Sequence, residues 1–257
     1  MPAMDSSGSR RETPTLRARG AIAARRGPQG PLELACLCGV ALALTWIATA
    51  LVPGGRFKDA VALHDFTLLS HTHASMLANG LLALLYAPFY VGWATLLVVV
   101  ALLRGRPRLA LAAGLVTLLT PLSAEALKPL LAHPHVRLGA PTVAPASWPS
   151  GHASAALALA LCAALVTPAN RRAIVMALGV VFSLAVGCAL LILAWHMPSD
   201  VIGGYLLAVL WMALAVAALR VADRRWPRSR GGREGSSSGP GARLGAPLGA
   251  MGARLPQ

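Results

Sequence analysis

Charged side chains are scarce in this sequence, and acidic ones are the scarcest. Only 12% of the 257 residues are Asp, Glu, Lys or Arg, and nine of them are acidic. In a typical soluble domain about a quarter of the residues carry charge. The composition therefore argues against a water-soluble domain.

Cysteine is also rare, and its placement does not suggest a disulfide framework. All four cysteines fall inside apolar stretches, where a thiol behaves as a small hydrophobic group. Cys36 and Cys38 have no second pair nearby, so we expect no metal there. Residues 1–30 contain no apolar core, so a cleaved signal peptide is not expected either.

Apolar residues make up 56% of the chain and gather in long stretches. Crossing a bilayer takes roughly 20 apolar residues, and hydropathy predicts six such spans. They lie at 34–52, 74–103, 109–127, 153–167, 173–195 and 201–219. The second contains Pro88, so we expect it to be kinked, or to be a half-span followed by a span. The predicted fold class is all-α: a polytopic membrane protein with a six-transmembrane-helix bundle and disordered basic tails.

The two tails, residues 1–30 and 223–257, are rich in glycine, serine, proline and arginine. Such segments have too little apolar content to fold, so we expect both to be disordered. The formal net charge is +14, and the tail arginines suit anionic lipid head groups. No nucleic-acid motif accompanies them, so we expect the bilayer as a partner and no nucleic acid.

The basic residues also predict the orientation in the membrane. With six spans, both tails share one side with the basic loops at 104–108 and 171–172. Cytoplasmic loops collect lysine and arginine, so we expect both termini in the cytoplasm of a multi-pass cell-membrane protein. The same folding places all seven histidines on the extracytoplasmic face. Histidine is suited to proton transfer near neutral pH, so chemistry is expected on that face.

The first polar motif is Pro149-Ser150-Gly151-His152, which precedes the fourth span. The first N–H groups of a helix are unpaired and suit a phosphate or another anion, beside which His152 could donate a proton. The alternative is an ordinary helix start at which Ser150 is the cap.

The second motif is His196-Met197-Pro198-Ser199-Asp200, at the turn between the last two spans. Asp200 could accept the Nδ1–H of His196 and leave Nε2 free as a nucleophile. Alternatively, Ser199 or Asp200 simply caps the last helix. The two roles are compatible.

Two basic residues stand before these motifs on the same side. Lys128 follows the third span, and Arg137 lies in a loop with few other charges. Glu125 lies one helical turn before Lys128, so the two are expected to pair. The alternative for Lys128 is contact with lipid head groups.

In this order, the motifs between Lys128 and Asp200 resemble those of the type 2 phosphatidic acid phosphatase family. This is the lipid phosphate phosphatase and vanadium haloperoxidase-related superfamily. The resemblance implies a membrane phosphatase-like domain at residues 31–222. It also implies that His196 attacks phosphorus to form a phosphohistidine, that Asp200 orients it, and that His152 protonates the leaving group.

The same resemblance implies a phosphate site without a metal ion or another cofactor, since fixed cations and N–H donors stabilise the charge. Its candidate residues are Lys128, Arg137, Ser150 and Gly151.

The sequence departs from the family pattern at two places. Where the family has an arginine-proline pair, this chain has His135 and Val136; Arg137 comes two positions late, and we keep it as a candidate. Where the family has an arginine six residues before the nucleophile, this chain has Leu190. A charge-assisted contact to phosphate is worth ~1.5 to 3 kcal/mol, so its loss would cost about one to two decades in rate or affinity.

We therefore predict an integral membrane phosphatase that hydrolyses a lipid phosphate or a polyprenyl diphosphate at the outer membrane face. A non-catalytic relative that binds lipid phosphate or scaffolds a membrane complex is the alternative, motivated by the missing arginine. A third interpretation is a metal protein, although histidines at this spacing are not a specific metal signature. Its ligands would be His133, His135, His152, His196 and Asp200. The sequence specifies neither the lipid nor an oligomeric state.

Overall fold

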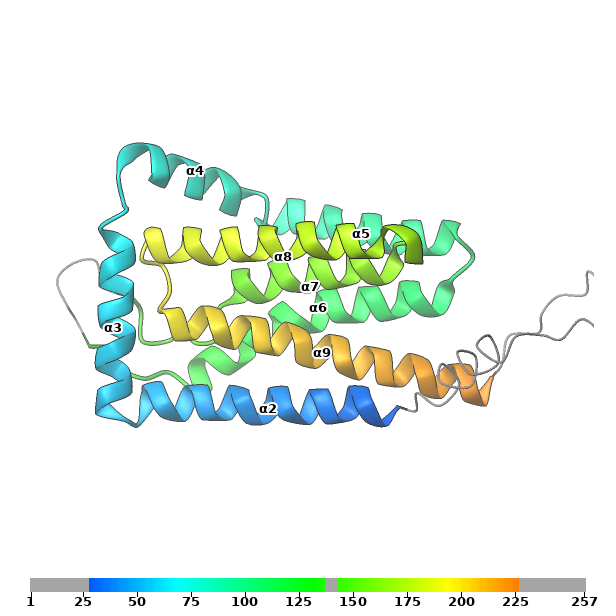
Figure 1. The fold of residues 1–257 in the computed structure, drawn as a ribbon, viewed down its shortest axis with the longest axis horizontal. Helices are drawn as coiled ribbons and strands as arrows, with labels where there is room; N and C mark the ends of the chain where they lie inside the picture. Colours follow the sequence, from blue (N-terminus) through cyan, green and yellow to red (C-terminus); the bar gives the residue numbers. More distant parts are fainter. Residues whose placement is uncertain (1–27, 137–142, 227–257) are drawn as a thin grey trace, which may run out of the picture.

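The computed structural model describes residues 28–136 and 143–226, which form helices and connecting turns (Figure 1). The helices are α2 (Gln29–Ala50), α3 (Pro53–Thr67), α4 (Thr72–Ala83), α5 (Ala87–Leu103), α6 (Pro107–Leu130), α7 (Gly151–Val166), α8 (Ala169–Ile192) and α9 (Pro198–Arg225). The predicted all-α membrane fold is confirmed. Most of both predicted disordered tails, and Arg137, lie outside the described residues.

The predicted count of six spans is slightly too high for the described residues. Four helices, α2, α6, α8 and α9, are long and apolar enough to cross a membrane. Helices α4 and α5 together make a fifth candidate, bent by 51°. The bend falls just before Pro88 in the first turn of α5, since proline fits a helix start and breaks an interior. Helix α7 is apolar but has only 16 residues, roughly 24 Å of helix.

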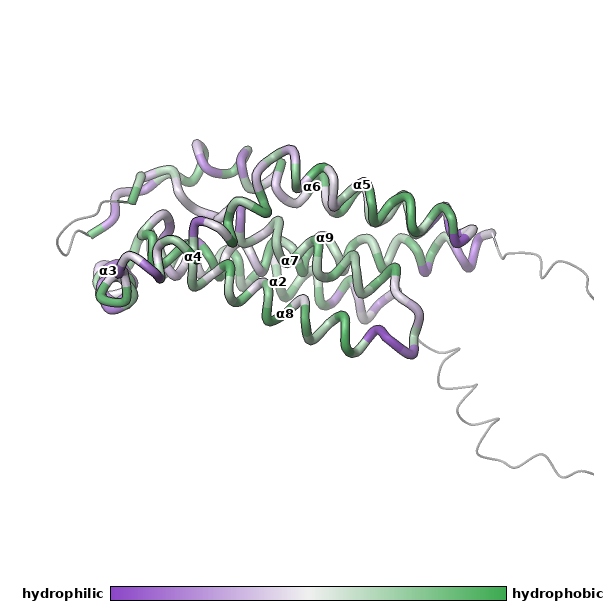
Figure 2. The backbone as a smooth tube through the Cα atoms, turned by 90° about the horizontal axis from the view of Figure 1, so that it is seen from above, coloured by the Kyte–Doolittle hydropathy of each residue, from purple (hydrophilic) through white to green (hydrophobic). Residues whose placement is uncertain are grey.

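The segment Pro53–Thr67 forms helix α3, whereas the sequence predicted an outer loop there. Pro53 takes a position in its first turn, where the missing N–H costs nothing. Figure 1 shows α3 lying across one end of the bundle, and Figure 2 shows it end-on. Ala60 and Leu63 are its buried residues, so α3 covers the end of the bundle with one face.

Helix α7 lies inside the bundle, in contact with α6, α8 and α9. Its buried positions are mostly alanines, including Ala153, Ala156 and Ala158, and these are completely buried. Small side chains let neighbouring helices approach closely inside a membrane. Helix α7 begins at the end of the bundle that α3 crosses (Figure 1).

The long helices alternate in direction, so the connections fall into two sets (Figure 1). One end of the bundle holds the start of α2, the end of α9 and the α5–α6 and α7–α8 turns. The other end holds α3, the segment before α7 and the α8–α9 turn. Figure 2 shows polar residues at both ends and apolar ones along the helices between them. All seven histidines lie in segments at the α3 end.

Candidate active site

Three helix ends form the candidate site at the α3 end of the bundle. They are the C-terminal turn of α6, which carries Lys128, the first turn of α7 with His152, and the α8–α9 turn with His196. Burial lowers the pKa of His152, the nearby His196 and Lys128 lower it further, and Glu125 opposes the shift. The His152 ring also lies 6.0 Å from the Trp195 ring. The structure therefore brings together side chains that are up to 68 positions apart in the sequence, the span from Lys128 to His196.

His196 and Asp200 form a buried pair. His196 Nδ1 lies 3.2 Å from Asp200 Oδ2, and the exposed fractions of the two residues are 7% and 0%. The same Oδ2 accepts the Met197 backbone N–H at 2.9 Å, so Asp200 also caps α9. Both predicted contacts of Asp200, with the histidine and with the helix start, are present. The Nδ1–H donated to Asp200 leaves the lone pair on His196 Nε2.

The start of α7 is tied to the start of α9. Ser150 is completely buried, and its Oγ accepts the Ala153 N–H at 3.3 Å, as the capping interpretation predicted. The Ser150 N–H donates to the Asp200 carbonyl oxygen at 2.9 Å. Gly204 makes this approach possible, because a Cβ there would lie 2.5 Å from the Ser150 carbonyl oxygen. Gly204 was not among the residues predicted from the sequence, although a Gly-Gly pair in an apolar span is typical of close helix packing.

Lys128 reaches the first turn of α7 together with its partner. Its Nζ lies 2.6 Å from Glu125 Oε1, so the predicted pair is confirmed. A Cβ on Gly151 would come within 2.6 Å of that oxygen and 3.8 Å of Lys128 Nζ. A carboxylate thus lies against the N-terminus of α7, the place where the sequence predicts a phosphate. The Glu125 side chain is 59% exposed, so it is free to move away.

Neither arginine position of the family pattern supplies a cation among the described residues. Leu190 is completely buried in an apolar cluster that also contains Leu82, Val186 and Val201. A guanidinium would not fit that environment without a buried partner. Arg137 lies outside the described residues.

His133 and His135 hold the segment that leads into α7. Nε2 of His135 lies 3.0 Å from Ser147 Oγ and 3.1 Å from the Ala144 carbonyl oxygen, and His133 Nδ1 lies 3.1 Å from the Leu131 carbonyl oxygen. Burial lowers the pKa of His135, while the nearby Asp200 opposes that shift. Within residues 28–136 and 143–226, no three His, Cys, Asp or Glu side chains form a group that could hold a metal ion.

Asp59 is a further residue at this end, for which the sequence alone indicated no role. Its two carboxylate oxygens accept hydrogen bonds from the backbone N–H and the hydroxyl of Ser199, at 3.0 and 2.6 Å. Burial raises the pKa of Asp59, and the nearby Asp200 contributes to the rise. The partners are 140 positions apart, so no local pattern in the sequence indicates the contact.

Comparisons with known proteins agree with the resemblance of the motifs. Residues 109–224 match the family model of the PAP2 superfamily. The fold is similar to the crystal structure of the first transmembrane PAP2 type phosphatidylglycerolphosphate phosphatase from Bacillus subtilis, with a TM-score of 0.61 and 19% identity. That match covers 78% of this chain and 98% of the other. No curated protein gives a significant match.

Proposed function

This chain belongs to the PAP2 superfamily, and we propose that it is a membrane phosphatase that removes a terminal phosphate from a lipid phosphate or a polyprenyl diphosphate. The observation that carries the proposal is the buried His196–Asp200 pair, which lies at the same end of the bundle as His152 and Lys128. Such a set can supply a nucleophile, an orienting carboxylate, a proton donor and a fixed cation.

In the first step His196 Nε2 attacks phosphorus. The bond from phosphorus to the leaving oxygen breaks, and its electron pair stays on that oxygen. His152 donates a proton to the leaving oxygen, while Asp200 stabilises the positive imidazole of His196 through Nδ1–H. The product of this step is a phosphohistidine.

In the second step water releases the phosphate. The water oxygen attacks phosphorus, the P–N bond breaks, and its electron pair returns to His196 Nε2. His152, now neutral, takes the proton from the water and recovers its starting state. No electron transfer is involved, so the cycle needs water as its only co-reactant.

The developing negative charge is stabilised by Lys128 and by the first N–H groups of α7, with Ser150 and Gly151 at that helix start. Gly151 keeps the approach open because it has no Cβ. The phosphate takes the place against α7 that the Glu125 carboxylate occupies, so Glu125 moves outward as the substrate binds. Arg137 is retained as a further phosphate-binding candidate.

The proposed location is the extracytoplasmic face of the cell membrane. The two basic turns lie at the end of the bundle away from the site, together with the start of α2 and the end of α9. The positive-inside rule assigns that basic end to the cytoplasm. A lipid head group can then reach His196 from the outer leaflet while its tails stay among the hydrocarbon chains.

The test is phosphate release by the full chain purified in detergent. A substrate panel of phosphatidate, phosphatidylglycerol phosphate and a polyprenyl diphosphate should contain at least one substrate. Vanadate should inhibit the reaction, and a chelator should leave it unchanged. Activity that a chelator abolishes would contradict the metal-free mechanism.

A second candidate is a lipid-phosphate-binding protein without catalysis. The completely buried Leu190 favours it, since the family pattern has arginine at that position. This candidate predicts that inorganic vanadate or a lipid phosphate binds while no member of the panel is hydrolysed, even at high protein concentration. Turnover that the substitution His196→Ala removes would rule it out.

A further inference from the structure

Helix α3 is joined to the candidate site by one side chain. Asp59 projects from α3 to the first turn of α9, where both of its oxygens bind Ser199. Ser199 itself is only 4% exposed. The contact is therefore a partly buried, bidentate link between the helix that crosses the end of the bundle and the turn that carries His196 and Asp200.

This link completes the capping of α9. The first N–H groups of a helix have no partner within the helix. Asp200 accepts the N–H of Met197, and Asp59 accepts the N–H of Ser199. Both carboxylates also lie at the positive end of the helix dipole. Asp59 thus fixes the residue directly before Asp200, in the same turn that places Asp200 against His196.

The turn before α9 needs such support because its backbone is strained. Ala194 has a φ of 51°, in the left-handed region that residues other than glycine rarely adopt. A conformation of this kind persists only where the surrounding structure holds it in place. Ala194 lies two positions before His196, so relaxation of this turn would move the imidazole.

From these contacts we propose that Asp59 is a positioning residue, which holds Ser199 so that Asp200 keeps the His196 imidazole aimed at phosphorus. The role rests on the proposed function, since it assumes that His196 is the nucleophile. It assigns a function to α3, which otherwise covers the end of the bundle without chemistry.

Protonation of Asp59 should weaken this link. A protonated carboxyl can no longer accept both hydrogen bonds of Ser199 in the same way. Burial and the neighbouring Asp200 raise the pKa of Asp59, while the two Ser199 hydrogen bonds and His133 oppose the rise. Asp59 therefore begins to lose the link at a higher pH than an ordinary aspartate would.

The experiment compares Asp59→Ala, Asp59→Asn and Ser199→Ala in the full chain, with Asp65→Asn as the control. Asp65 is the other carboxylate of α3 and is exposed. Asp59→Ala should lower kcat by about ten- to a hundredfold and change KM by less than about threefold, because alignment is lost while phosphate contacts remain. Asp59→Asn and Ser199→Ala should cause smaller losses, and Asp65→Asn none.

A second readout does not depend on turnover. In protein labelled with ¹⁵N-histidine, the Nδ1–H signal of His196 reports its hydrogen bond to Asp200. That signal should shift or broaden in Asp59→Ala and stay unchanged in Asp65→Asn.

The outcomes separate this inference from the proposed function. An Asp59→Ala protein that keeps both kcat and the His196 signal overturns the positioning role. If the wild type hydrolyses no substrate but the signal changes in Asp59→Ala, the link between Asp59 and the His196–Asp200 pair is real, and it is the phosphatase proposal that fails. If Asp59→Ala does not fold, Ser199→Ala decides, because it removes only the hydroxyl donor. An unchanged signal and rate in Ser199→Ala then overturn the inference.

Discussion

The two ends of the bundle use charge in opposite ways. At the basic end, arginines donate to carbonyl oxygens where helices finish. Arg104 donates to the Val166 carbonyl oxygen at the end of α7, and Arg172 donates to that of Ala164 at 3.1 Å. At the α3 end, carboxylates accept from N–H groups where α9 begins. Each arrangement places a charge opposite the sign of the helix terminus.

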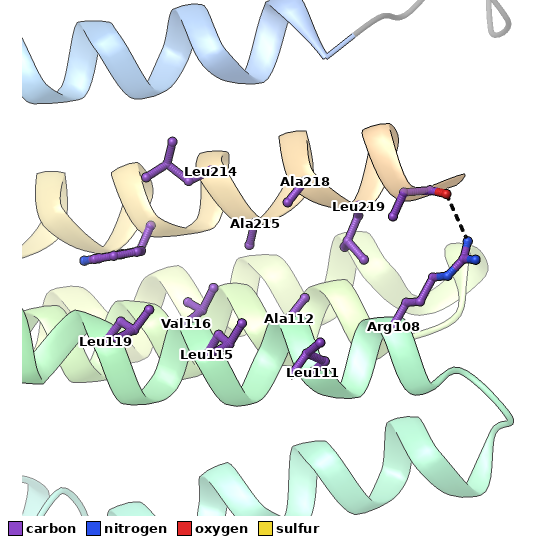
Figure 3. Close-up of a pocket in the computed structure, with 12 residues that line it drawn as sticks. Arg108, Leu111, Ala112, Leu115, Val116, Leu119, Leu214, Ala215, Ala218 and Leu219 are labelled. Atoms are coloured by element: carbon purple, nitrogen blue, oxygen red, sulfur yellow. Dashed lines mark hydrogen bonds between the residues drawn. The ribbon is translucent and has the colours of Figure 1, made fainter. Parts of the chain in front are cut away.

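Arg108 at the basic end binds other groups of the protein. Arg108 binds Asp223 at 2.8 Å and the Trp226 carbonyl oxygen at 2.8 Å. It also donates to the Ala222 carbonyl oxygen at 3.4 Å, the contact drawn as a dashed line in Figure 3. It closes one end of a groove of about 310 Å³ between α6 and α9 whose other lining side chains are apolar. The contacts of Arg104, Arg108 and Arg172 therefore stabilise the fold at this end of the bundle.

At the α3 end, a polar atom of the candidate site lacks a hydrogen-bond partner among the described residues. Within residues 28–136 and 143–226, Asp200 Oδ1 is buried without a hydrogen-bond partner. Lys128 is held by a carboxylate that is itself largely exposed. Asp200 at the α3 end thus keeps a buried carboxylate oxygen without a partner among the described residues, whereas Arg104, Arg108 and Arg172 at the basic end are bound within the fold.

The largest effect should come from His196→Ala. Loss of the nucleophile should lower phosphate release by at least about three orders of magnitude, because both chemical steps depend on its Nε2. His64→Ala is the matched control, since His64 is an exposed histidine of α3 at the same end. Phosphate release and thermal unfolding in detergent are measured together. An active His196→Ala protein would show that the α3 end is not where the chemistry occurs.

Lys128 and Glu125 should respond in opposite directions. Lys128→Gln removes the cation beside α7 and should lower kcat/KM by about ten- to a hundredfold. Glu125→Gln removes the competing carboxylate and should lower KM or the vanadate inhibition constant by a few fold. Steady-state kinetics on the two variants measure kcat and KM. If both substitutions weaken substrate binding equally, the Lys128–Glu125 pair stabilises the fold, as Arg104 does at the basic end.

Arg104→Met tests the basic end. This arginine donates a charge-assisted hydrogen bond to the end of α7, so its loss should destabilise the protein by about 1 to 3 kcal/mol. Because the site lies at the other end, kcat should stay within about twofold of wild type. Unfolding by denaturant and phosphate release give the two values. A large loss of kcat in a folded Arg104→Met protein would break the division between the two ends.

The smallest effect should be a pH dependence of the free energy of unfolding that comes from His135 at the α3 end. Burial lowers the pKa of His135 from its ordinary value of 6.5. The unfolded chain then binds more protons than the folded one, so this stabilising contribution is present above pH 6.5 and is lost as the pH falls through the lower folded pKa. His135→Gln should flatten the curve of unfolding temperature against pH between about pH 5 and 7. An unchanged slope would contradict the assignment.

The sequence predicted those parts of the molecule that depend on local pattern. Hydropathy located the segments that form α2 and α5 to α9, and Pro88 indicated the break before α5. The order of basic, Ser-Gly-His and His-x-x-x-Asp motifs indicated the candidate site, because each motif begins or ends a helix at the same end of the bundle. The orientation in the membrane that the basic turns indicate stays a prediction.

The contacts that no local pattern encodes were missed. The orientation of α3 across the bundle and the Asp59–Ser199 link depend on tertiary packing between distant segments. Likewise, nothing around Glu125 indicated that its carboxylate would lie against Gly151, because that approach depends on how α6 and α7 pack. Composition also could not show that α7, with 16 residues, would be the interior helix.

The most direct test of the account is the identity of the phosphorylated residue. The full chain is mixed with a ³²P-labelled substrate from the panel and quenched within the first turnover, and its peptides are then separated. The account predicts an acid-labile, base-stable label on the peptide that contains His196, and no label in His196→Ala. A label on another residue, or a wild type that turns over without any label on His196, would contradict it.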